Sequence, residues 1–112
     1  MDWKYKHFHQ QRSFPASRDA VVEAARRYMS ESLGWNVTDA ADGLRAEGYG
    51  FSHAAVANFR IQSVGNGTTI IVDLSVERSG PTGFMLFDVG GYYNIQIRKW
   101  LDAIQSAIQQ ME

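Results

Sequence analysis

The strongest constraint on the fold is a pair of long alternating segments on either side of Asn66-Gly67. Asn-Gly can adopt the left-handed conformations that a two-residue hairpin turn needs, and apolar-polar alternation is typical of a strand with one buried face. Counting outward from Asn66 and Gly67 at the turn centre predicts which residues pair across the hairpin. The predicted inward pairs are Ser63 with Ile70, Ile61 with Val72, Phe59 with Leu74, and Ala57 with Val76.

The opposite face of this hairpin is predicted to be mostly polar. Its pairs are Gln62 with Ile71, Arg60 with Asp73, Asn58 with Ser75, and Val56 with Glu77. Arg60 and Asp73 would then match opposite charges across the two strands, which favours this register. A slip of one residue would turn every apolar side chain to the wrong face.

Three further segments are predicted to be strands. Residues 35–39 and 44–49 alternate on either side of Ala40-Ala41-Asp42-Gly43, and Asp-Gly is a strong reversal signal, so they predict another hairpin. Residues 5–13 alternate more weakly and predict a first strand, which Phe14-Pro15-Ala16 ends.

Two helices are predicted. The first spans residues 18–33, with Ser17 as its N-cap, Asp19 near its positive end and Gly34 as its C-terminal stop. The second begins at about Tyr92, because apolar residues recur from there at helical spacing. This stripe comprises Ile97, Trp100, Leu101, Ile104, Ala107, Ile108 and Met111. Residues 84–91, which include Gly90-Gly91, receive no assigned conformation.

The order strand, helix, four strands, helix predicts an α+β two-layer sandwich, because two amphipathic helices need an apolar sheet face to cover. Both helices are expected on one face of an antiparallel sheet. This order resembles the TATA-box-binding-protein-like fold and the START-related helix-grip proteins that hold lipids, hormones and polyketides. Local similarities to the helix-grip group are Phe14–Ser17 entering the first helix, Gly67–Thr69 opening a strand that ends at Val76-Glu77-Arg78, and Trp100-Leu101.

Composition narrows the classes of protein to consider. The 112 residues are expected to form one domain, and the absence of cysteine excludes disulfides, thiolate nucleophiles and cysteine-based zinc sites. The sequence has neither an apolar run long enough to cross a membrane nor an apolar signal-peptide core near Met1, so we expect a cytoplasmic protein. A net charge of −1 and a mixed-charge outer sheet face argue against nucleic acid as a partner.

No set of residues points to a catalytic or metal site. His7 and His9 would share one strand face, but two histidines without a nearby carboxylate in sequence are a weak zinc signal. The positions of Asp42 and Glu47 are explained by a turn and by an outward strand position. Gly90-Gly91 lacks the lysine of a phosphate-binding loop. We therefore expect no catalytic residues, no metal and no cofactor.

The inner sheet face carries several small residues, namely Ala46, Gly48, Gly50, Ala55 and Ala57. Large residues on the helices either fill the space above them or leave a cavity. In the second case Trp35, Phe59, Leu74 and Trp100 would line a pocket for a small apolar ligand. The outer face presents Tyr49, Phe51, Val56 and Ile71, and such a cluster can associate with a second copy of the chain.

These two faces give two functional hypotheses. The first is a binding domain that holds an apolar ligand between the C-terminal helix and the sheet. The second is a homo-oligomeric module that associates through the uncovered sheet face. The helix-grip resemblance also implies a third alternative, an enzyme of the cyclase or hydratase kind, for which no catalytic pair is evident.

Overall fold

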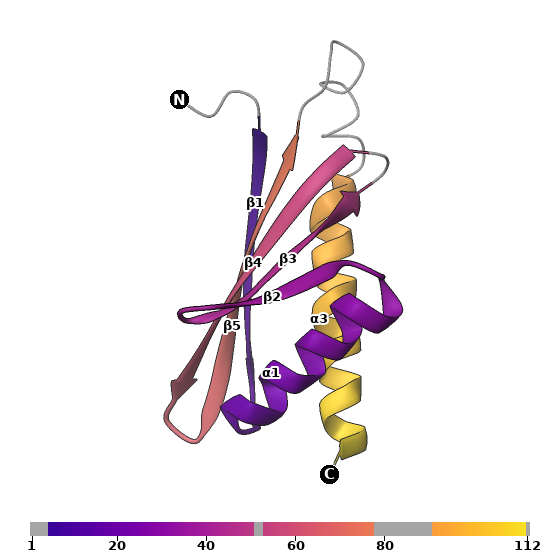
Figure 1. The fold of residues 1–112 in the computed structure, drawn as a ribbon. Coiled ribbons are helices and arrows are strands. Elements are labelled where there is room, and N and C mark those ends of the chain that lie inside the picture. The colour runs from indigo at the N-terminus through magenta and orange to yellow at the C-terminus, as the bar shows by residue number, and fades with distance from the viewer. Residues whose placement is uncertain (1–4, 51–52, 78–90, 112) are drawn as a thin grey trace.

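The structure is a computed structural model that describes residues 5–50, 53–77 and 91–111. Its elements are β1 (Tyr5–Phe14), α1 (Arg18–Arg27), η1 (Tyr28–Ser32), β2 (Asn36–Ala40), β3 (Gly43–Gly50), β4 (His53–Val64), β5 (Gly67–Glu77) and α3 (Tyr92–Met111). The strands form one antiparallel sheet in the order β1-β5-β4-β3-β2, with both helices on the same face (Figure 1). The predicted α+β class, element order and two-layer arrangement are confirmed.

The first helix begins where the sequence predicts. The Ser17 hydroxyl accepts a hydrogen bond from the Ala20 amide at 3.3 Å, which satisfies one of the four amides that a helix start leaves unpaired. Val21, Ala24 and Ala25 are buried against the sheet. The last turn, η1, is a π-helix, because the Leu33 amide donates to the Tyr28 carbonyl five residues earlier, at 3.1 Å.

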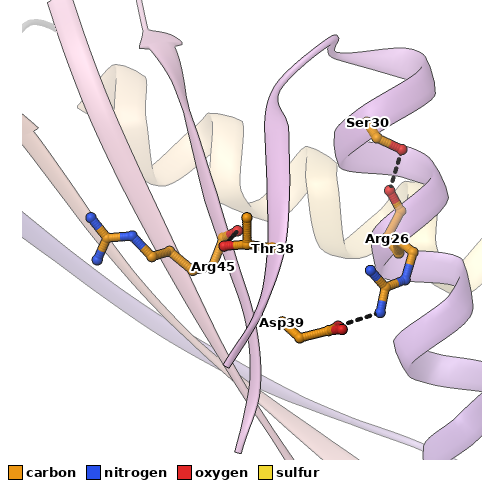
Figure 2. Close-up of polar contacts among 5 residues, drawn as sticks. All are labelled: Arg26, Ser30, Thr38, Asp39 and Arg45. Atoms are coloured by element: carbon orange, nitrogen blue, oxygen red, sulfur yellow. Dashed lines mark hydrogen bonds and ion pairs between the residues drawn. The ribbon is translucent and has the colours of Figure 1, made fainter. Parts of the chain in front are cut away.

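Two polar contacts accompany this end of the helix (Figure 2). The Ser30 hydroxyl donates to the Arg26 carbonyl at 2.8 Å, a side-chain bond that competes with regular helix bonding. The Arg26 guanidinium contacts the Asp39 carboxylate at 2.5 Å. Asp39 lies on β2, the edge strand, so this ion pair joins α1 to the edge of the sheet.

The β4–β5 hairpin has the predicted faces but a different register. Phe59 pairs with Val72 rather than with Leu74, a shift of two residues, and Val64 pairs with Gly67. The turn centre is therefore Gly65-Asn66, not Asn66-Gly67. Because side chains alternate with a period of two, a two-residue shift leaves every residue on its predicted face. Ala57, Phe59, Ile61, Ile70, Val72, Leu74 and Val76 are all buried.

Two glycines explain this register. Gly65 has φ +60°, the left-handed conformation that glycine adopts without strain. A Cβ at Gly67 would lie 2.5 Å from the Phe14 carbonyl oxygen. Because β1 passes this close, only glycine fits at position 67. The first glycine makes the turn and the second belongs to β5.

The predicted charge match between Arg60 and Asp73 is wrong. In the observed register Arg60 pairs with Ile71, and Asp73 pairs with Asn58. The Arg60 guanidinium lies 3.6 Å from the Asp42 carboxylate, and the Asp73 carboxylate lies 2.6 Å from Nδ1 of His9 on β1. The sheet places β1 beside β5, which supplies Asp73 with a partner that counting along one hairpin does not reveal.

The β2–β3 hairpin turns where predicted. Ala40 pairs with Gly43, so Ala41 and Asp42 occupy the turn centre. The Asp42 carbonyl accepts a hydrogen bond from the Ile61 amide at 2.9 Å, and a Cβ at Gly43 would overlap the Phe59 carbonyl. Gly43 thus allows the turn to pack closely on β4.

The long helix α3 covers the inner face beside β1. Ile97, Leu101 and Ile104 are fully buried, in agreement with the predicted stripe. Two polar side chains of β1 also contact α3. Gln10 donates to the Asn94 carbonyl at 2.8 Å, and Arg12 contacts the Asp102 carboxylate at 2.6 Å. Within the described residues, neither α3 nor the other helices combine the length and apolar character that a membrane crossing requires.

Ser17→Ala should destabilise the protein by about 1 kcal/mol, because the first turn of α1 loses its side-chain cap. Urea unfolding followed by circular dichroism measures this free energy. Ser106→Ala is the matched control, since Ser106 is exposed in the middle of α3 and alanine is the better helix former. A loss in the control equal to that of Ser17→Ala would contradict the capping role.

Candidate functional site

The site is built around Trp35, whose backbone is fixed by the end of the first helix. Gly34 has φ +72°, and the Trp35 amide donates to the Met29 carbonyl at 2.8 Å. A left-handed glycine followed by an amide that bonds back to the last helical turn is the usual way in which a helix ends and the chain reverses. The side chain of Trp35 is thereby directed onto the inner face of β3.

The indole ring of Trp35 lies directly on Gly48. A Cβ at Gly48 would overlap this ring, so only glycine allows the close approach. On its other side, Trp35 meets Trp100 of α3 edge to face, with ring centroids 5.3 Å apart and an interplanar angle of 76°. Trp35 therefore connects β3 with α3 and fills most of the space above the small inner residues.

The first turns of α3 complete the aromatic cluster. Tyr93 is only 3% exposed, and its ring lies 5.2 Å from that of Phe8 and 4.9 Å from that of Tyr92. Burial, with a smaller contribution from Tyr92, raises the pKa of Tyr93 above its ordinary value. Tyr93 is therefore a neutral phenol at physiological pH.

A small hollow remains between these rings and the sheet. Its volume is about 90 Å³. The lining residues come from both layers and are Leu33, Trp35, Tyr49, Ala55, Leu74, Tyr92, Tyr93, Gln96 and Trp100. We call this hollow the inner pocket.

The inner pocket brings together three of the four predicted pocket residues, Trp35, Leu74 and Trp100. Phe59 is buried in the core but does not line the pocket. It lies four residues along β4 from Ala55, which corresponds to roughly 13 Å of strand. The four predicted residues thus all lie between the helices and the sheet, but they do not all line one site.

The sequence did not lead us to predict any tyrosine in the lining of the inner pocket. Tyr93 precedes Ile97 by four residues and Trp100 by seven, so it extends the apolar stripe of α3 by one turn, a signal that was available. Leu33 and Gln96 carried no comparable signal, because the first lies at the end of the first helix and the second is a polar residue outside the apolar stripe of α3.

The residues predicted for an interface are dispersed on the uncovered face. Tyr49 is 74% exposed, whereas Val56 and Ile71 are partly buried among polar neighbours. Val56 pairs with Glu47 and Ser75, and Ile71 pairs with Arg60 and Gln11. Phe51 lies outside the described residues.

His7 and His9 both point to this outer face, as the alternation of β1 predicts. Nδ1 of His7 lies 2.9 Å from the Ser75 hydroxyl, and His9 contacts Asp73. Within residues 5–50, 53–77 and 91–111, no three side chains of His, Asp or Glu come together as metal ligands would. These histidines join β1 to β5 on the outer face.

Two solved structures resemble this chain over nearly its whole length. The crystal structure of Ara h 8.0201 superimposes with a TM-score of 0.56 at 8% identity, covering 95% of this chain and 99% of that one. TTHA0849 from Thermus thermophilus aligns at 14% identity with a TM-score of 0.49, covering 96% and 99%. No protein-family model matches the sequence, and no curated protein is significantly similar to it.

The likeness to Ara h 8.0201 extends over nearly the whole of both chains, and it confirms the helix-grip fold that the element order suggested. At such low identity it establishes the arrangement of helices and strands alone.

Gly48→Ala should cost about 1–3 kcal/mol, because the added methyl group displaces the Trp35 ring. Urea unfolding gives the free energy, and tryptophan fluorescence reports the displaced ring. In a Trp35→Leu background the same substitution should cost much less, so a double-mutant cycle isolates the contact. Equal costs in both backgrounds would show that Trp35 and Gly48 do not interact.

Tyr93 should make stability fall at alkaline pH. Its pKa is raised by folding, so its stabilising contribution is complete below the unfolded value near 10 and is lost as pH rises toward the folded value. Tyr93→Phe should therefore flatten the loss of unfolding free energy above about pH 10, relative to the wild type. A Tyr93→Phe variant that loses stability over this range as steeply as the wild type would contradict the role of Tyr93.

Proposed function

We propose that this protein binds a small, neutral and mainly apolar molecule in the inner pocket, between the start of α3 and the sheet. The observation that carries this proposal is an aromatic-lined hollow between the start of α3 and the sheet. Trp35 and Trp100 supply flat apolar surfaces that favour a ring or a short hydrocarbon chain.

The polarity of the lining supports a neutral ligand. None of the lining residues within the described part of the chain carries a carboxylate, an ammonium or a guanidinium group. The polar groups are the Gln96 amide and the tyrosine hydroxyls, and Tyr93 stays protonated because its pKa is raised. A charged ligand would lose its hydration without gaining a partner, whereas a neutral ligand with one hydroxyl or carbonyl group would not.

The size of the pocket limits the ligand. Pockets for drug-sized molecules occupy roughly 300–1,000 Å³, so the observed 90 Å³ suits a single ring unless the walls move apart. The helix-grip proteins, whose fold this chain has, hold lipids, hormones and polyketides in the same layer between helix and sheet. That general use of the fold supports the proposal without naming a ligand.

Self-association through the uncovered sheet face is the second candidate. Its supporting observation is Tyr49, whose side chain is 74% exposed on that face. Native mass spectrometry of the purified protein separates the two candidates. A monomer mass with a small co-purified adduct would support binding, and a doubled mass without one would support association.

Replacing a small residue in the pocket should abolish binding without unfolding the protein. Ala55 lines the inner pocket, whereas Ala57 is buried two residues further along β4 and does not line it. Ala55→Leu should fill the hollow, weaken binding by about tenfold or more and cost less than about 1 kcal/mol of stability. Ala57→Leu should overfill packed space and cost about 1–3 kcal/mol, but retain the affinity.

Benzyl alcohol serves as the probe, titrated while tryptophan fluorescence is followed, and urea unfolding supplies the two stabilities. Equal binding by wild type and Ala55→Leu would place the ligand elsewhere and contradict the proposal.

A further inference from the structure

The uncovered sheet face carries a second hollow at the same end of the molecule. The starts of β1 and β4 and the ends of β3 and β5 lie together there (Figure 1). The register places Tyr49 opposite Ala54 and Tyr5 opposite Glu77, and it places Ala54 beside Glu77, since the adjacent residues Ala55 and Val76 pair. One row across β3, β4, β5 and β1 therefore consists of Tyr49, Ala54, Glu77 and Tyr5.

Small side chains leave this row hollow in the middle. The groove has a volume of about 280 Å³ and is lined by Tyr5, Glu47, Gly48, Tyr49, Ala54, Ala55, Val56 and Glu77. We call it the outer groove. Tyr49 and Tyr5 stand at opposite sides of it and are 74% and 40% exposed, which is high for such large rings.

The charged side chains that the structure describes in the outer groove are both acidic. Among the described residues, its lining contains two carboxylates and no lysine, arginine or histidine. Glu47 shares its charge with Arg45 at 3.0 Å, whereas Glu77 makes no ion pair with any of the residues that the structure describes. Tyrosine faces also attract cations, so the rings and the carboxylates select the same kind of ligand.

We propose that the outer groove binds a linear aliphatic polyamine, with one ammonium group near Glu77, another near Glu47 and the methylene chain over Ala54 and Val56. Glu47 on β3 and Glu77 on β5 are separated by β4, hence by roughly 10–12 Å. A bare divalent cation does not fit this spacing, because it needs several oxygens within about 2.5 Å. An extended cation with an apolar middle fits this spacing.

The outer groove shares Tyr49 and Ala55 with the inner pocket, but its two carboxylates, Glu47 and Glu77, do not line that pocket. Spermidine is the probe, titrated into the full chain while backbone amide shifts are followed by NMR. The shifts should concentrate in residues 47–49, 54–56 and 77, and the affinity should fall as sodium chloride is raised. Butylamine, with one ammonium group, should bind more weakly.

Glu77→Gln should weaken spermidine binding about two- to fivefold, as expected for one exposed charge pair. Tyr49→Ala should weaken it by a similar factor through loss of the ring face, and its high exposure makes it safe for folding. The control is Glu31→Gln, which makes the same change in net charge on the exposed helix surface and should leave the affinity unchanged.

Three results would overturn the proposal. An equal loss of spermidine affinity in Glu31→Gln would show that only the overall charge of the protein attracts spermidine. Butylamine binding as tightly as spermidine would show that the two carboxylates do not act together. Tighter binding of an arginine-containing peptide at the same amides would assign the groove to a protein partner instead.

Discussion

The contact between the Trp35 ring and Gly48 determines how the two layers meet at the end of the molecule that holds the inner pocket. Gly48 lets the indole lie flat on the sheet, and Trp100 of α3 then packs against it edge to face. The contact depends in turn on Gly34, whose left-handed backbone follows η1 and places the Trp35 side chain on β3. Two glycines and two tryptophans thus set the size of the inner pocket.

The faces of the sheet were predictable, whereas its register was not. Alternation assigns each residue of β4 and β5 to a face, and that assignment survives any shift by an even number of residues. In the sequence, only the turn residues distinguish among such shifts. Gly65-Asn66-Gly67 allows two overlapping turn centres, Gly65-Asn66 and Asn66-Gly67. The contact of Gly67 with Phe14 decides between them, and it comes from a strand more than fifty residues away in sequence. The wrong Arg60–Asp73 pair follows from the same ambiguity.

The pocket shows the corresponding limit for function. Periodicity tells which side chains face inward, but not which of them lie at the same height along a strand or helix. Trp35, Leu74 and Trp100 share a height, while Phe59 belongs to the middle of the core. Tyr93 was within reach of the sequence, since it continues the stripe of Ile97 and Trp100. The outer groove was not, because it requires β1 to lie beside β5, and only the assembled sheet brings Tyr5 next to Glu77.

Both hollows arise from one property of the sequence, the run of small residues where β3 ends and β4 begins. Gly48 and Ala55 pair on the inner face, and Ala54 lies opposite Tyr49 on the outer face. A strand pair with so little side-chain volume leaves space on both faces, at a cost in buried apolar area that larger residues would avoid. On the inner face Trp35 recovers most of that area. On the outer face the two tyrosines stand at the sides of the space without covering it, which leaves the carboxylates of Glu47 and Glu77 accessible from solvent.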